Sequence, residues 1–279
     1  MTAQAASLPA APAVRRTALP RLVRVELLKL TSTRATYGLF AASVGLTLLW
    51  TILEASRAGT PNGPAALSGY AGQAAIITGG VWGLIFAAVL GVTISTGEFH
   101  HRTATLTYLA TPARTRVLAA KVAAGAIAAA AFGLAGYAVT LAIGLIFTGA
   151  RGYHLAVGAE TLTDWGLGHL VGAALLGVIG VVIGSLVRNQ LAAVIGVYVW
   201  TLIIESVVGA LFTAVRPYLP YTAATTLAGT PLGSASFGPG RGASSVAPLP
   251  FAAATALLVA IALVGALIAT RTVLRRDIS

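Results

Sequence analysis

Six long apolar runs constrain this chain more than any other feature of its sequence. A helix rises about 1.5 Å per residue and the hydrocarbon core of a bilayer is about 30 Å thick, so such runs predict membrane-spanning helices. Only 9% of the residues are charged, whereas soluble domains have about 25%. The runs lack the alternating pattern of barrel strands, which favours an all-α integral membrane fold. The predicted spans are residues 37–53, 73–96, 117–148, 164–187, 190–213 and 251–270.

The distribution of basic residues predicts how the spans are oriented. Six spans place both termini on one side of the membrane. Fourteen of the 18 Lys and Arg residues lie before the first span or after the second, fourth and sixth, and four lie in the opposite segments. Because cytoplasmic loops carry an excess of Lys and Arg, we expect both termini and the segment after the second span to be cytoplasmic. The net charge of +11 is therefore interpreted as membrane topology, and no nucleic-acid partner is predicted.

The N-terminal part of the chain divides into a tail and an amphipathic stretch. Residues 1–19 are rich in Ala and Pro and lack the apolar run of a secretory signal, which predicts a disordered cytoplasmic tail before a single six-span domain at 20–279. Apolar residues then recur at helical spacing and predict a helix in the headgroup layer, with a plain basic lead-in as the alternative. Glu26 interrupts this stripe, which consists of Leu19, Leu22, Val23, Leu27 and Leu30.

A second non-spanning stretch separates the fifth and sixth predicted spans. Residues 215–229 are apolar and aromatic enough to form short helices, which we expect to dip into the outer leaflet as a re-entrant segment. The residues that follow, up to 250, are rich in Gly, Ser and Pro, and this composition predicts a flexible connection.

The stretch GEFHHRTATLTYLATPARTRVLAAK, residues 97–121, is unusually charged for this chain. Glu98 and Arg102 are four residues apart and can pair on one helix face. Thr111 can cap a second helix that begins at Pro112. A loop needed only for topology could be much shorter, so the length favours a short cytoplasmic helix that binds a partner protein. A solvated loop is the alternative.

These residues resemble a known family. The stretch is similar to the intracellular segment after the second span of bacterial ABC-2 type exporter permeases, which has Gly-Glu-aromatic-basic, a Thr-rich turn, Thr-Pro, a basic pair and Leu-Ala-Lys. Residues 23–39 resemble the lead-in helix of that family, especially as written in actinobacterial members. The Tyr-Leu-Pro sequence at 218–220 resembles its re-entrant outer segment.

The resemblance implies a function and a set of partners. Such permeases are the membrane half of an exporter in the bacterial cytoplasmic membrane, working as a homodimer or with a sister permease. Separate ATPase subunits bind ATP and Mg²⁺, and the cargo would be a drug, an antibiotic or a lipid-like molecule. His100 and His101 stand where the family commonly has Arg, so docking of the ATPase would depend on pH. The implied coupling residues are Glu98, Phe99, His100, His101, Arg102, Thr105, Leu106 and Leu109.

The sequence contains no recognisable catalytic or ligand-binding motif. Neither lysine, Lys29 or Lys121, follows the glycines of a P-loop, and there are no cysteines and no HExxH or GxSxG pattern. No catalytic, cofactor-binding or metal-binding residue is therefore predicted. ATP hydrolysis is expected on a separate subunit.

One acid, Glu205, lies well inside a predicted span. Such residues are unfavourable in lipid, so we hypothesise that Glu205 faces a cavity and contacts cationic or polar cargo, with a packing role as the alternative. Two rival functions remain open. A proton-coupled secondary carrier would need buried acids or broken helices in the membrane, and only Glu205 meets that requirement in the sequence. A non-transporting scaffold subunit would bind a partner without moving a substrate.

Overall fold

The computed structural model describes residues 18–100, 114–187, 189–232 and 246–275, and all regular structure in these ranges is helical. The helices are α1 (Leu19–Ser32), α2 (Arg34–Arg57), α3 (Tyr70–Ile77), α4 (Val81–His100), α6 (Arg114–Ala150), α7 (Ala159–Val187), α8 (Gln190–Tyr198), a π-helical turn (Val199–Ile204), α9 (Glu205–Leu211), a 3₁₀ turn (Arg216–Tyr218), α10 (Pro220–Leu227) and α11 (Phe251–Arg275).

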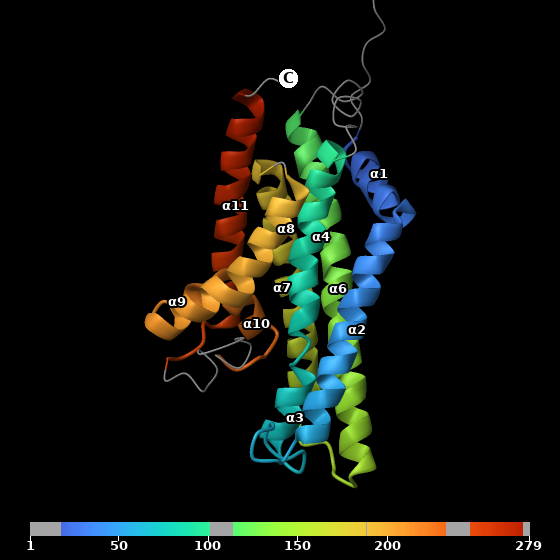
Figure 1. Ribbon diagram of the computed structural model, residues 1–279, viewed down its shortest axis with the longest axis vertical. Coiled ribbons are helices and arrows are strands. Elements are labelled where there is room, and N and C mark those ends of the chain that lie inside the picture. Colours follow the sequence, from blue (N-terminus) through green and yellow to red (C-terminus); the bar gives the residue numbers. More distant parts are fainter. Residues whose placement is uncertain (1–17, 101–113, 188, 233–245, 276–279) are drawn as a thin grey trace, which may run out of the picture.

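Six helical segments are long and apolar enough to cross a membrane, which confirms the six predicted spans in number and approximate position. They cover residues 34–57, 70–97, 115–150, 159–187, 190–211 and 251–271. The chain therefore has the helices of a multi-pass membrane protein. Figure 1 shows α1 and the last turns of α11 at one end of the bundle and α3 at the other.

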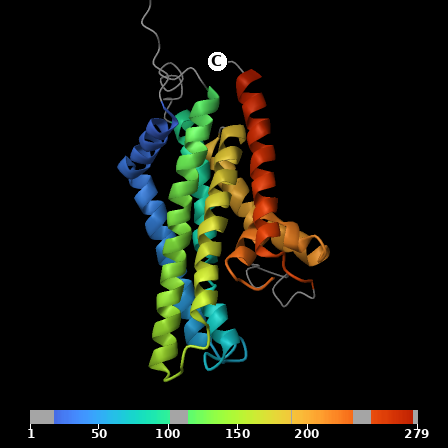
Figure 2. The ribbon, with the colours of Figure 1, turned by 180° about the vertical axis from the view of Figure 1, so that it is seen from behind.

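Helix α4 lies at the centre of the bundle, between α6 and α7 and beside α2 and α8 (Figures 1 and 2). In the most apolar 18-residue stretch of the second span, 83% of the residues are buried. In the corresponding stretch of the sixth span, only 17% are buried. The contact between α4 and α7 depends on glycine. A Cβ at Gly91 would collide with the carbonyl of Gly177, and one at Gly180 would collide with that of Ala88. The small-residue ridges therefore bring these two backbones together.

The second span is broken, which the sequence analysis did not predict. Helix α3 ends at Ile77 and α4 begins at Val81, with Thr78, Gly79 and Gly80 between them. Hydroxyl groups from other parts of the chain donate hydrogen bonds to the backbone carbonyls near the break. The Thr140 hydroxyl donates to the Ile77 carbonyl at 2.7 Å, and the Thr230 hydroxyl donates to the Thr78 carbonyl at 2.9 Å. Such replacement bonds allow a helix to break inside a membrane protein.

The predicted N-terminal amphipathic helix is present as α1. Leu22, Val23, Leu27 and Leu30 are half-buried, as the stripe predicts, whereas Leu19 is exposed. The residue that interrupts the stripe, Glu26, is the one buried residue of this helix. The polar position in the stripe is therefore the one that packs most deeply against the bundle.

The fifth span and the segment after it form a separate corner of the fold. Helix α8 runs through the π-helical turn into α9, which leans away from α7 in Figure 1. The chain then turns through the 3₁₀ segment into α10, which packs against α7 and α11. The expected short helices after the fifth span are thus observed.

Candidate functional site

Three of the eight residues assigned to coupling lie at the end of the bundle that carries α1. Glu98, Phe99 and His100 form the last residues of α4, and their side chains are not described. The chain resumes at the start of α6, so the segment connects two helix ends that lie close to α1 (Figure 1). The other implied coupling residues lie outside the described residues: His101, Arg102, Thr105, Leu106 and Leu109.

A buried ion pair lies beside these two helix ends. The Lys121 ammonium, on the first part of α6, donates to Glu26 Oε2 at 3.1 Å and to the Ile94 carbonyl of α4 at 3.4 Å. Lys29 binds the other oxygen of Glu26, with its Nζ 2.7 Å from Oε1. The Glu26 and Lys121 side chains are only 8% and 6% exposed. The ion pair therefore joins α1 to α6, and the same ammonium joins α6 to α4.

Glu205 is buried at the junction of the π-helical turn and α9. Its Oε1 accepts from Trp200 Nε1 and from the Tyr221 backbone N–H, each at 2.9 Å. Its Oε2 accepts from the Thr222 backbone N–H at 2.9 Å and the Thr222 hydroxyl at 3.0 Å. A carboxylate offers about four lone-pair sites, so these four donors use its full capacity.

The four bonds give Glu205 a definite structural role. Tyr221 and Thr222 lie in the first turn of α10, whose backbone N–H groups have no partner within the helix. Neither Leu219 at the N-cap nor its neighbour Pro220 supplies a capping side chain. The carboxylate therefore caps α10 from another span, where the positive end of the helix dipole favours a negative charge.

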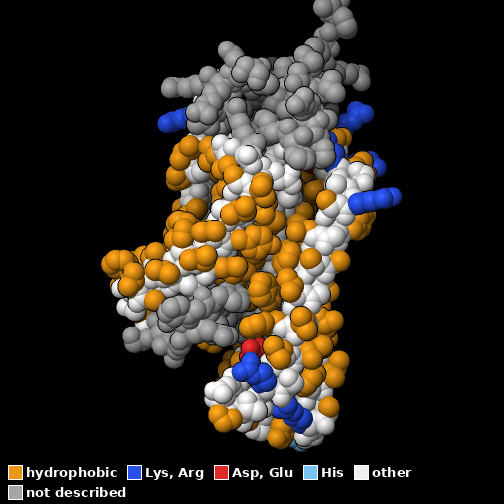
Figure 3. All heavy atoms as spheres, viewed as in Figure 1, with side chains coloured by type: hydrophobic (Ala, Val, Ile, Leu, Met, Phe, Trp, Pro, Cys, Tyr) orange, Lys and Arg blue, Asp and Glu red, His pale blue; other side chains and the backbone are white. Residues whose placement is uncertain are grey.

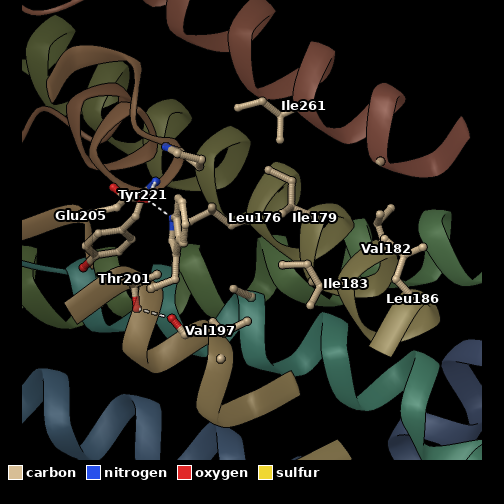
Figure 4. A pocket seen from close by; sticks show the side chains of 16 residues that line it. Leu176, Ile179, Val182, Ile183, Leu186, Val197, Thr201, Glu205, Tyr221 and Ile261 are labelled. Atoms are coloured by element: carbon tan, nitrogen blue, oxygen red, sulfur yellow. Dashed lines mark hydrogen bonds between the residues drawn. The ribbon is translucent and has the colours of Figure 1, made fainter. Parts of the chain in front are cut away.

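Glu205 also lies in the wall of a cavity of about 370 Å³ between α7, α8, the π-helical turn, α10 and α11. Figure 4 shows Leu176, Ile179, Val182 and other aliphatic side chains along this space, with Glu205 and Tyr221 at one end. The polar side chains in the wall are bonded to the protein. Thr201 donates to the Val197 carbonyl at 2.8 Å, and Tyr221 donates to the Val81 carbonyl at 3.3 Å.

This geometry favours an apolar occupant. The volume is in the range of small-molecule pockets, about 300–1,000 Å³. The Glu205 lone pairs already accept from protein donors, so a cargo molecule would have to displace one of them to form a hydrogen bond. The hypothesis that Glu205 contacts cationic or polar cargo stays a prediction, and the bonds around it describe a positioning role.

A second polar side chain, His169, lies buried beside the break in the second span. Its Nδ1 is 2.9 Å from the Trp165 carbonyl. A carbonyl only accepts, so Nδ1 carries the hydrogen and Nε2 of the neutral ring is an acceptor. Nε2 has no hydrogen-bond partner among the described residues. It faces the break, because a Cβ at Gly80 would lie 2.9 Å from it.

Sequence reasoning identified Glu205 but missed most of its neighbours. Trp200 and Thr222 carry no local signal for their role as donors, and the ion pair of Glu26 with Lys121 joins residues 95 positions apart. A charged residue in an apolar stripe was the one available signal for that pair. Comparison with known proteins adds no relative, because no family model and no curated protein matches the chain.

Proposed function

We propose that this chain is the membrane-spanning permease subunit of an ABC-2 type exporter in the bacterial cytoplasmic membrane. Two permeases would work with two ATPase subunits that bind ATP and Mg²⁺. Both termini would face the cytoplasm, and residues 98–109 would form the docking helix for the ATPase. The proposal is supported by the sequence of residues 97–121, the six apolar helices and the position of this segment between α4 and α6.

The observation that carries the proposal is the buried contact of Glu26 with Lys121 and, through Lys121, with the Ile94 carbonyl. A docking helix transmits force only if the elements around its base move together. This contact joins α1, α4 and α6 beside the two ends of the segment. Motion of an ATPase bound there would reach three helices of the permease at once.

The cargo in this proposal is a drug, an antibiotic or a lipid-like molecule. The cavity of about 370 Å³ supports the more apolar members of this group. Its wall is mostly aliphatic, and its polar side chains are occupied by bonds to the protein. The segment Arg216–Leu227 would be the re-entrant element that closes the outer end, with Glu205 fixing the start of α10.

Affinity purification of the tagged full chain from its native membranes in mild detergent tests this proposal. We expect an ATP-binding subunit and ATPase activity in the eluate, both lost from the double variant Glu98→Ala with Arg102→Ala. The matched control is Glu54→Ala with Arg57→Ala, which removes the same charges in the last turns of α2, at the other end of the bundle. Absence of an ATPase from a monodisperse sample, or equal loss in both variants, would contradict the proposal.

One observation favours a second candidate, a proton-coupled carrier. Broken helices and buried ionisable residues are typical of secondary transporters, and the break at Thr78–Gly80 lies beside His169. Uptake of a fluorescent amphiphile into inverted membrane vesicles separates the two. An exporter requires ATP and continues in the presence of an uncoupler. A carrier stops with the uncoupler and loses activity in His169→Ala.

A further inference from the structure

A second cavity, of about 430 Å³, lies between α1, α2, α4, α6 and α8 at the end of the bundle that carries α1. We call it the α1 cavity. It is separate from the cavity beside Glu205, and the proposed transport function does not use it. The residues that matter for its chemistry are Glu26, Lys29, Thr36, Lys121 and Gln190 in its polar part and Leu39, Val89 and Val194 in its apolar part.

The polar part of the α1 cavity contains two lysines and one glutamate among the described lining residues. Lys121 lies deep, with a side chain 6% exposed, and bonds to Glu26. Lys29 bonds to the same carboxylate, but its side chain is 43% exposed, so a ligand in the cavity can reach it. Of these three groups, the Lys29 ammonium is therefore the one open enough to meet an anion.

The walls of the cavity change character along the bundle. On α8, Gln190 at the helix start is followed by Val194 one turn further in, and on α2, Thr36 is followed by Leu39. On α4, the lining residues run from Gly97 through Ile94 and Thr93 to Val89, about 12 Å deeper at 1.5 Å per residue, and the Thr93 hydroxyl donates to the Leu90 carbonyl of its own helix. A polar mouth above an apolar slot is the shape of a site for an amphiphile.

The surroundings of the cavity match the headgroup layer of a membrane. Helix α1 has a half-buried apolar face and exposed Arg21 and Arg24, as interfacial helices do. Figure 3 shows basic side chains at this end and at the opposite end of the molecule, with hydrophobic side chains over the middle of the visible face. Basic pockets between spans on the cytoplasmic side of membrane proteins bind anionic lipid headgroups.

We propose that the α1 cavity binds a membrane phospholipid with an anionic headgroup. Its phosphate contacts Lys29 and the polar groups at the mouth, and one acyl chain lies along α4 between α2 and α8. The bound lipid thereby holds α1 in position over the base of α6. This site requires the chain to lie in a membrane, but it does not require the chain to transport a cargo.

Native mass spectrometry of the full chain in mild detergent tests the site, with phosphatidylglycerol and phosphatidylcholine supplied at equal concentration. We expect wild type to retain phosphatidylglycerol preferentially. Lys29→Gln should bind it about tenfold more weakly, because a hydrogen bond to a charged group is lost. Arg24→Gln removes the same charge from an exposed position on the same helix outside the cavity, and should bind as wild type does.

A second pair of variants tests the slot without changing charge. Ala35 lines the cavity, whereas Ala41 is exposed on the same helix outside it. Ala35→Phe should reduce lipid retention, and Ala41→Phe should leave it unchanged. Equal weakening by Lys29→Gln and Arg24→Gln would overturn the proposal in favour of general surface attraction. Displacement of the lipid by an equal concentration of glycerol phosphate would overturn the assigned role of the acyl chain.

Discussion

Removal of the Glu205 carboxylate should destabilise α10 by an amount that follows from its four bonds. In Glu205→Ala the buried backbone N–H of Tyr221 and the partly buried backbone N–H of Thr222 lose their acceptor. Each orphaned buried donor is destabilising by about 1–3 kcal/mol. The two amides alone therefore predict a loss of roughly 2–6 kcal/mol in the free energy of unfolding.

Thermal unfolding in detergent, followed by tryptophan fluorescence, measures this loss as a decrease in Tm of several degrees. Glu205→Gln keeps one acceptor oxygen and should lie between wild type and Glu205→Ala. Glu160→Ala is the matched control, because Glu160 is an exposed carboxylate in the first turn of α7 and should contribute less than about 1 kcal/mol. An unchanged Tm in Glu205→Ala would refute the capping role.

Three further predictions concern the packing of the bundle. Glu26→Ala leaves Lys121 buried without its carboxylate and should be destabilising by about 3–5 kcal/mol, partly restored by adding Lys121→Met, in denaturant titrations. Gly91→Leu should separate α4 from α7 and reduce the monodisperse fraction in size-exclusion chromatography, whereas Gly45→Leu, where a Cβ meets nothing within 4 Å, should not. Thr140→Val removes the donor to the Ile77 carbonyl and should decrease thermal stability by about 1 kcal/mol.

The spans could be predicted because the bilayer sets a length that local composition reveals. Each predicted apolar run is helical in the structure. This includes the Tyr70–Gly97 span, although its helix is broken. The break itself could not be predicted, since Gly79 and Gly80 resemble an ordinary small-residue ridge. Its carbonyls are occupied by Thr140 and Thr230, which come from other parts of the chain. This information lies in tertiary contacts and not in a local pattern.

Charged residues inside apolar stretches were the most informative exceptions to the pattern. Glu26 and Glu205 were both visible as anomalies, because burying a charge requires a partner. The sequence could not identify the partners. Lys121 is 95 residues from Glu26, and the α10 amides become available to Glu205 only after the chain turns between α9 and α10. A charged residue in an apolar stretch therefore predicts a buried polar contact. The partner residue can be identified only from the structure.

Site-specific photocrosslinking tests the central claim most directly. A photoreactive amino acid is placed at Leu106 of the full chain, and at Arg57, at the other end of the bundle, as the control. After irradiation of intact cells, mass spectrometry identifies the linked protein. The account predicts that Leu106 links to an ATP-binding subunit and that Arg57 does not. Links from Leu106 only to lipid or to other proteins, in cells that express the ATPase, would contradict it.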